Sequence, residues 1–165
     1  MMKLQSLSVP CRFTKTVVLT LYFIVSFYCF GALVIENDVN YKTWYFIRSS
    51  DFPLFHQQLQ RLLLPVFMFP LALQLFLCIV LLWAKPSNVS KLYVWALVFL
   101  NIYILGISFL LQVPIHDKLN VQKSNALLNE LIYTHASYRL PAEVLLFILN
   151  GVLLFKLLEL KASDT

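Results

Sequence analysis

The chain alternates between long apolar segments and short polar ones. Four apolar segments lie at about residues 16–35, 62–84, 92–112 and 141–160, and none carries a charged residue in its central part. Each has about the 20 residues that an α-helix needs to cross the hydrocarbon core of a bilayer. The pattern therefore predicts an all-α fold, an integral membrane four-helix bundle that forms a single four-span domain over residues 1–165.

The two longer polar segments, residues 36–61 and 113–140, have a helical periodicity of their own. Apolar side chains recur on one face within residues 51–63 and again within residues 124–139. We expect the first of these helices to run directly into the second span, and the second to lie at the membrane interface or over the mouth of the bundle. The prediction is a bundle with short amphipathic helices on its outer face.

A proline follows the third apolar segment closely. Pro114 lacks an amide hydrogen and disfavours helical backbone at Val113. We therefore expect the third span to end there and the chain to turn along the membrane surface. This would place His116 beside the points where the second and fourth spans emerge.

Composition supports a membrane protein and excludes several other classes. Hydrophobic residues make up 60% of the chain and charged residues 13%, against about 45–50% and about 25% in soluble domains. The partner that this composition predicts is membrane lipid. The net charge of +5 comes from few charges in total, so it does not indicate nucleic acid. Three cysteines without a C-x-x-C pattern argue against a disulfide framework and a thiol redox pair.

The charges differ between the two sides of the predicted bundle. The side with both termini carries seven basic and two acidic residues, and the opposite side carries six of each. The positive-inside rule then predicts that the N and C termini are cytoplasmic, in a plasma or inner membrane. The sequon Asn88-Val89-Ser90 falls on the same side as the termini and is expected to stay unglycosylated.

Four side chains are candidates for chemistry, and all lie on the side opposite the termini. His56, His116 and His135 each fall near a predicted membrane boundary, where an imidazole can act as a general base or bind a metal. Arg139 lies four residues after His135 and four before Glu143, so it could orient an anionic oxygen. The competing interpretation is interfacial packing for the histidines and an Arg139–Glu143 anchor. No spacing typical of a metal site is present, so metal and cofactor stay unknown.

Three amides lie near the middle of three different apolar segments. Gln74, Asn101 and Asn150 fall at similar predicted depth. Amides at one depth can hydrogen-bond across helices, so we expect them to fix the bundle, with a polar path or a ligand contact as the alternative.

Three short stretches resemble motifs of a known family. These are "DFPLFH" before the second span, "VPIHDKL" after the third and "LIYTHASYR" before the fourth. They resemble motifs of the small four-span membrane proteins grouped with fungal anthrone oxygenases and their bacterial relatives. The resemblance implies a four-span fold and an oxidoreductase or oxygenase-like enzyme that acts on an apolar or phenolic substrate. The resemblance supplies only the reaction class, and the candidate polar centre, which is His56, His116, His135 and Arg139, follows from the positions of these residues in the sequence.

Two non-enzymatic functions stay open beside this one, so the residues alone do not decide whether the chain is an enzyme. The first is a membrane subunit that packs against a partner membrane protein through its aromatic faces, because 15% of the residues are aromatic. The second is a protein that binds or carries an apolar small molecule. The absence of charge in the central parts of the predicted spans argues against transport.

Overall fold

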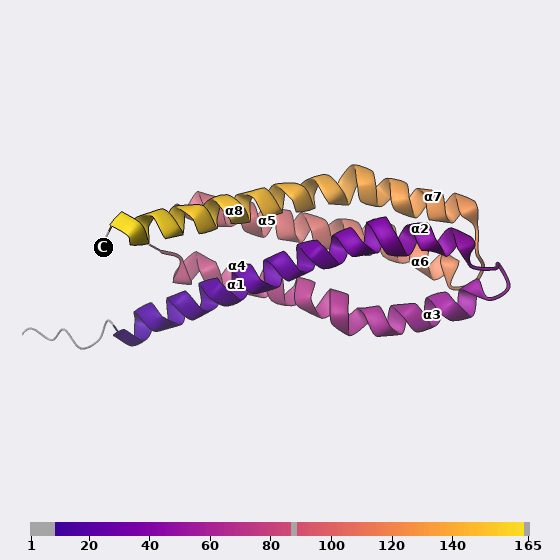
Figure 1. Cartoon of the computed structure of the whole chain (residues 1–165), viewed down its shortest axis with the longest axis horizontal. Helices are drawn as coiled ribbons and strands as arrows, with labels where there is room; N and C mark the ends of the chain where they lie inside the picture. Colours follow the sequence, from indigo (N-terminus) through magenta and orange to yellow (C-terminus); the bar gives the residue numbers. More distant parts are fainter. Residues whose placement is uncertain (1–8, 87–88, 164–165) are drawn as a thin grey trace, which may run out of the picture.

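Four long helices run side by side along the whole length of the molecule (Figure 1). The computed structural model describes residues 9–86 and 89–163. Each long helix is a succession of α-helix and π-helical turn, with the π-helical turns labelled η1, η3, η4 and η5. The first comprises α1 (Val9–Ile35), η1 (Glu36–Asn40), α2 (Tyr41–Thr43) and the 3-10 turn η2 (Trp44–Phe46). The second comprises α3 (Phe52–Leu63), η3 (Leu64–Met68) and α4 (Phe69–Ala84).

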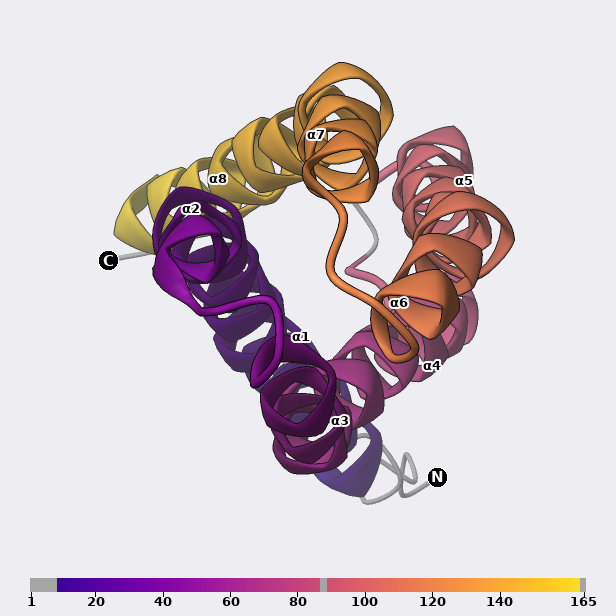
Figure 2. The ribbon, with the colours of Figure 1, turned by 90° about the vertical axis from the view of Figure 1, so that its right-hand side faces the viewer.

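The third and fourth long helices are built in the same way. The third comprises α5 (Lys91–Ile107), η4 (Ser108–Gln112) and α6 (Val113–Leu119), and the fourth comprises α7 (Asn125–Thr134), η5 (His135–Arg139) and α8 (Leu140–Ser163). The start of α1 and the end of α8 lie at one end of the bundle, here called the termini end. The opposite end, which holds α2, α3, α6 and α7, is the distal end (Figure 2).

The bundle has the composition of a multi-pass membrane protein. Four helical segments of 29 to 35 residues, Lys15–Phe46, Phe52–Ala84, Lys91–Leu119 and Asn125–Glu159, are long and apolar enough to cross a membrane. Large apolar side chains such as Ile24, Phe76, Phe99 and Phe155 are exposed on the outer surface of the bundle. Such a surface suits lipid as the solvent. The predicted all-α four-helix bundle is therefore confirmed.

Three apolar clusters hold the bundle together, the smallest of which consists of Cys29, Leu33 and Leu71. The largest lies in the half nearer the termini end and includes Tyr22, Leu81, Leu97 and Leu153. The second, here called the distal cluster, consists of Tyr41, Trp44, Phe52, Ile115, Leu119, Leu128 and Leu131. Its members come from all four long helices, so the helical extensions beyond the apolar segments pack into one body.

The prediction that the third span ends at Val113 is wrong, because the helix continues through Pro114 to Leu119. The backbone N–H of Val113 bonds the carbonyl of Ser108, five residues earlier. This wider turn moves the preceding carbonyls out of the path of the proline ring, which in an α-helix would collide with the carbonyl four residues back. His116 therefore lies on a helix that prolongs the third span and not on a turn along the membrane surface.

A π-helical turn interrupts each of the four long helices in its distal half. In each turn a backbone N–H bonds the carbonyl five residues earlier: Tyr41 to Glu36, Phe69 to Leu64, Val113 to Ser108 and Leu140 to His135. Turns of this kind are rare and occur often at functional sites. Three of the four bury two polar side chains each: Glu36 and Asn37 in η1, Ser108 and Gln112 in η4, and His135 and Arg139 in η5.

The glycines in the long helices are not needed for close packing. A β-carbon placed on Gly31, Gly106 or Gly151 would meet no atom within 4 Å outside its own helix backbone. We expect each change to alanine to stabilise the bundle by about 0.5–1 kcal/mol, because alanine loses less backbone entropy in a helix. Melting in detergent measures the effect, and a lower melting temperature than wild type would show that the glycine serves a close contact or a bend.

Candidate functional site

Polar side chains are buried in the distal half of the bundle, where the four long helices carry their π turns. The set comprises Glu36, Asn37, His56, Ser108, Gln112, Thr134, His135, Arg139 and Glu143. Burying polar groups in an apolar bundle is costly unless they are paired. Their concentration in the distal half of the bundle marks this region as the candidate site.

Two of the predicted histidines are in direct contact. His56 Nε2 lies 3.0 Å from His116 Nδ1, and the two rings are nearly parallel with centroids 5.2 Å apart. On its other side His56 Nδ1 lies 2.7 Å from Asn120 Oδ1. Asn120 Nδ2 in turn donates to Gln60 Oε1 at 2.8 Å. The chain of bonds therefore runs from Gln60 through Asn120 and His56 to His116.

This chain of bonds assigns a role to each ring nitrogen. Asn120 Oδ1 can only accept, so His56 Nδ1 carries a hydrogen and donates it. A neutral His56 then accepts at Nε2 from the Nδ1 hydrogen of His116. The Nε2 lone pair of His116 is left without a partner among the described residues. The arrangement thus presents one unprotonated imidazole nitrogen in a fixed tautomer, as a general base requires.

Aromatic rings fix the orientation of the two imidazoles. Phe52 stacks on His56 with centroids 5.3 Å apart and an interplanar angle of 17°. The Trp44 ring meets both imidazoles edge-on, with ring centroids 5.0 Å apart for His56 and 5.9 Å apart for His116. The centroid of the Tyr41 ring lies 6.1 Å from that of the His116 ring. These rings are buried members of the distal cluster, so the histidine pair has little freedom to rotate.

Arg139 is a buried cation with three different neighbours. Its Nε lies 2.7 Å from Glu143 Oε1, and the two side chains are only 4% and 2% exposed. Its Nη1 donates to Gln112 Oε1, and its guanidinium carbon lies 5.5 Å from the centroid of the Phe67 ring. Nη2 has no hydrogen-bond partner among the described residues. Arg139 is therefore held in place and keeps donors for an anionic oxygen.

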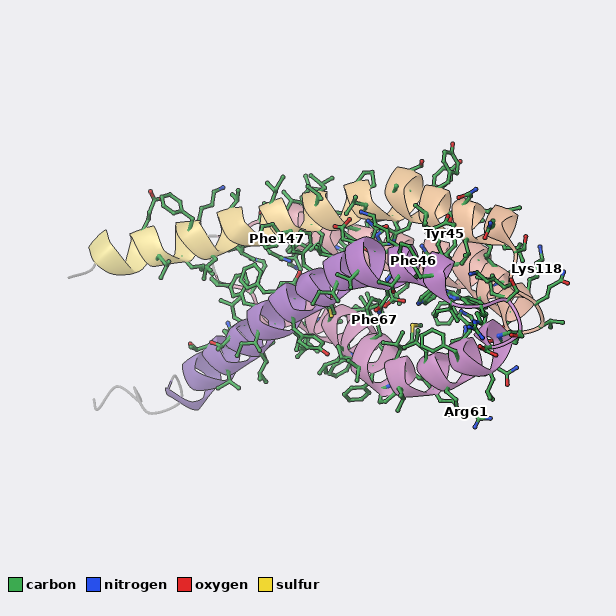
Figure 3. All side chains as sticks on the ribbon, turned by 45° about the vertical axis from the view of Figure 1, so that its right-hand side comes forward. Tyr45, Phe46, Arg61, Phe67, Lys118 and Phe147 are labelled. Carbon is green, nitrogen blue, oxygen red and sulfur yellow. The ribbon has the colours of Figure 1, made fainter. Side chains whose placement is uncertain are left out.

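A cavity of about 570 Å³ lies against both His116 and Arg139. One wall comes from α3 and η3 and the other from η4 and α6, with η1 and Arg139 at the inner side. Its apolar lining includes Leu59, Leu63, Leu64, Phe67, Met68, Phe109 and Val113. A mainly apolar cavity of this size with a few convergent polar groups is typical of a small-molecule site. Arg61 and Lys118 extend outward nearby at the distal end (Figure 3).

Three of the four predicted site residues, His56, His116 and Arg139, are linked by a direct contact or by the large cavity, and His135 is not. His56 bonds His116, and His116 shares the cavity with Arg139. His135 does not line this cavity. It is fully buried, lies 6.0 Å from the Tyr41 ring by ring centroids, and has no hydrogen-bond partner for either ring nitrogen among the described residues.

Several residues of the site escaped the sequence analysis. Glu36, Tyr41, Trp44 and Gln112 line the cavity, and Asn120 orients His56. Glu36 and Gln112 stand directly at the ends of apolar segments, where a polar residue is usually solvated at the interface. The position of Asn120 four residues after His116 was a usable signal, because residues at that spacing share a helix face.

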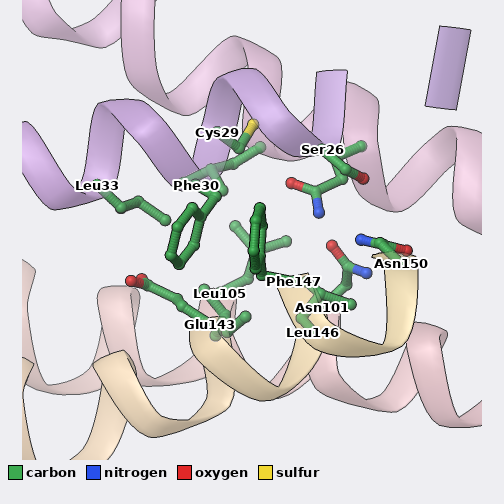
Figure 4. Close-up of a pocket in the computed structure, with 13 residues that line it drawn as sticks. Ser26, Cys29, Phe30, Leu33, Asn101, Leu105, Glu143, Leu146, Phe147 and Asn150 are labelled. Carbon is green, nitrogen blue, oxygen red and sulfur yellow. The ribbon is translucent and has the colours of Figure 1, made fainter. Parts of the chain in front are cut away.

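A second, much smaller cavity lies deeper in the bundle. Its volume is about 20 Å³, and its lining includes Ser26, Gln74, Asn101, Glu143 and Asn150 (Figure 4). This is room for one water molecule, and Ser26 Oγ and Glu143 Oε2 have no hydrogen-bond partner among the described residues. The polar lining suits a bound water.

The three amides are all buried, but the predicted bonding between helices is made by only one of them. Asn150 Oδ1 accepts from Tyr22 of α1 at 2.9 Å. Asn101 Nδ2 instead donates to the Leu97 carbonyl of its own helix at 2.8 Å. Together with Gln74 they line the small cavity, so these amides give the bundle interior a polar layer.

Comparison with known proteins adds no family to this description. No protein-family model, no curated protein and no solved structure matches the chain. Within the residues that the structure describes, no group of three His, Cys, Asp or Glu side chains is arranged to hold a metal ion. The function is therefore argued from the geometry of the cavity and its residues.

Proposed function

We propose that the protein is a membrane oxidoreductase of the oxygenase type, which acts on an apolar phenolic substrate as anthrone oxygenases do. The observation that carries the proposal is the cavity of about 570 Å³ in which His116 and Arg139 share one apolar space. His116 supplies an unpaired ring nitrogen, and Arg139 supplies hydrogen-bond donors with positive charge. A base and an oxyanion partner at one cavity are what the removal of a proton beside a carbonyl requires.

The reaction begins with an enolisable ring ketone, the keto form of a phenol. His116 Nε2 takes a proton from the ring CH₂ carbon, and Arg139 donates a hydrogen bond to the oxygen that becomes negative. The resulting carbanion adds dioxygen and forms a peroxide anion. His116 returns its proton to that peroxide, and loss of water leaves a new carbonyl. One CH₂ group and one O₂ thus become one C=O group and one H₂O, with no further electron donor.

The histidine pair assists the transfer of the proton. When His116 is protonated, its Nδ1 hydrogen is still bonded to His56 Nε2, which spreads the positive charge over two rings. Asn120 keeps His56 in the tautomer that can accept this bond. We therefore assign His116 as the catalytic base, Arg139 as the oxyanion partner, and His56 and Asn120 as positioning residues.

Anthrone itself is a suitable probe for this activity. The purified protein in detergent micelles is mixed with anthrone in air-saturated buffer, while dissolved oxygen and the absorbance of the quinone product are followed together. We expect one O₂ consumed per quinone formed, at a rate above that of buffer with micelles alone. Saturable binding of anthrone without added oxygen consumption would instead favour the alternative function, a binding protein for apolar small molecules, which the same cavity supports.

We further propose that the termini face the cytoplasm of a plasma or inner membrane, so that the candidate site opens on the outer half. The support is the excess of basic residues near the termini end. Asn88 of the sequon lies outside the described residues. A sequon so close to the membrane can escape glycosylation for steric reasons, so cysteine labelling is the better test. In a cysteine-free background, Lys91→Cys should resist an impermeant thiol reagent in intact cells, and Asn125→Cys should react. The opposite labelling pattern would invert the orientation.

A further inference from the structure

We infer that the large cavity is loaded sideways from the bilayer, through a mouth between η3 of the second long helix and η4 and α6 of the third. Its ligand is accordingly a lipid-dissolved amphiphile with a flat apolar body and one polar oxygen. The inference rests on the proposed function only in placing that oxygen at Arg139 and His116. The mouth is defined by Leu64, Phe109 and Val113.

The residues of the mouth face the outside of the bundle and the cavity at once. Leu64, Phe109 and Val113 line the cavity, yet all three are exposed large apolar side chains. They lie on helical segments that are apolar enough to cross a membrane. An opening framed by such side chains is disfavoured in water and favoured in hydrocarbon. The mouth therefore faces lipid acyl chains.

The rim of the cavity changes from apolar to polar along the bundle. Towards the distal end it carries the exposed side chains of Gln57, Arg61 and Asp117. Arg61 stands only three residues from Leu64, so the change occurs within one helical turn. A gradient of this kind matches the boundary between hydrocarbon and headgroups. It suits a ligand that rests at that boundary with its polar oxygen outward before it enters.

Among the described residues the distal end offers no comparable entrance, because the distal cluster closes the bundle there. Trp44, Phe52, Leu119, Leu128 and Leu131 in this cluster are almost completely buried.

Hydrogen bonds also tie the distal segments to one another. Lys123 Nζ donates to the carbonyls of Tyr45 and Ile47, and Tyr45 donates its hydroxyl hydrogen to Asn129. A ligand from water would have to break these contacts, whereas the side entrance needs only movement of exposed apolar side chains.

Trp44 provides a reporter for this route without any substrate or turnover. It lines the cavity and is buried from the outer surface. With Trp83→Phe and Trp95→Phe it becomes the single tryptophan of the chain. The full-length protein is reconstituted in vesicles whose lipids carry bromine on their acyl chains, which quench tryptophan fluorescence on close approach, and in matching vesicles without bromine. Iodide in the buffer tests access from water.

We expect brominated chains to quench Trp44 and iodide to have little effect. Val113→Phe narrows the mouth and should at least halve the quenching by brominated lipid, whereas Phe109→Ala widens the mouth and should increase it. The matched control is Val144→Phe on α8, because Val144 is 38% exposed and Val113 is 37% exposed, but Val144 does not line the cavity. This control should leave the quenching unchanged.

Two results would overturn the lateral entrance. One is stronger quenching of Trp44 by iodide than by brominated chains. The other is equal quenching in Val113→Phe, Phe109→Ala and Val144→Phe. The outcome is independent of the proposed reaction, because neither anthrone nor oxygen consumption enters the measurement. Quenching by brominated lipid that depends on the mouth residues, without anthrone turnover, would therefore refute the proposed function alone. Anthrone turnover without such quenching would refute the lateral entrance alone.

Discussion

Arg139→Gln is expected to destabilise the bundle by about 3–5 kcal/mol, because it leaves the Glu143 carboxylate buried without its cation. The ion pair is 2.7 Å long and its side chains are 4% and 2% exposed, so the carboxylate left behind is largely shielded from solvent. The double variant Arg139→Gln with Glu143→Gln should recover most of this loss, since two neutral amides leave no buried charge. Reversible unfolding in mixed micelles measures all three free energies.

The chain contains a matched control for this prediction. Lys42 and Asp38 form an ion pair at the same i,i+4 spacing and 2.8 Å apart, but their side chains are 59% and 54% exposed. Lys42→Gln should cost no more than about 0.5 kcal/mol, the usual value of an exposed helical pair. An Arg139→Gln loss as small as that of Lys42→Gln would show that the buried carboxylate is not charged. A double variant no more stable than Arg139→Gln would contradict the pairing.

His116→Ala is expected to lower the rate of anthrone oxidation by roughly 10²–10⁴-fold, the usual contribution of a general base. His56→Ala should also lower the rate, because it removes the acceptor that fixes the His116 tautomer. The double variant should be no slower than His116→Ala alone, since residues that act as a unit are not additive. Initial rates of oxygen consumption, compared at equal amounts of folded protein, test this expectation.

His135→Leu is the control for the histidine pair. It also removes a buried imidazole from the distal half of the bundle, but His135 does not line the cavity and its ring nitrogens have no partners among the described residues. Replacing an unpaired polar group by an apolar one of similar size should leave stability unchanged or raised. Turnover should persist. A rate loss as large as that of His116→Ala would place His135 in the reaction after all.

The fold was predictable because it depends on features that are read directly from composition. Apolar segments of membrane-crossing length, without central charges, determine the number of helices and their type. The meeting of His56 with His116 also followed the sequence argument, since both lie just beyond spans on the same side. The contact was expected from a turn at Pro114, however, whereas the structure produces it through two helices that continue past the apolar segments.

Two of the expectations that failed depend on π turns, namely the end of the third span and the common helix face of His135 and Arg139. Spacing arguments assume about 3.6 residues per turn, and on that basis His135 and Arg139 share one helix face. In the structure both lie within η5, where the wider turn changes their relative direction. His135 consequently lies beside Tyr41, while Arg139 reaches the cavity. A proline stands two residues after three of the four π turns, at Pro70, Pro114 and Pro141, but none follows η1, so the residue pattern alone does not locate every π turn.

The repetition of this turn in all four long helices suggests how such a site could arise and be engineered. A single inserted residue is the smallest change that converts an α-helical turn into a π turn. A plain apolar bundle could thus acquire a polar interior by separate insertions, each rotating the distal part of one helix while the half near the termini keeps its register. Deleting one residue from η1, η4 or η5 would restore an α-helical turn in that helix. The bundle would otherwise stay intact, but the two polar side chains of that turn would no longer be buried together.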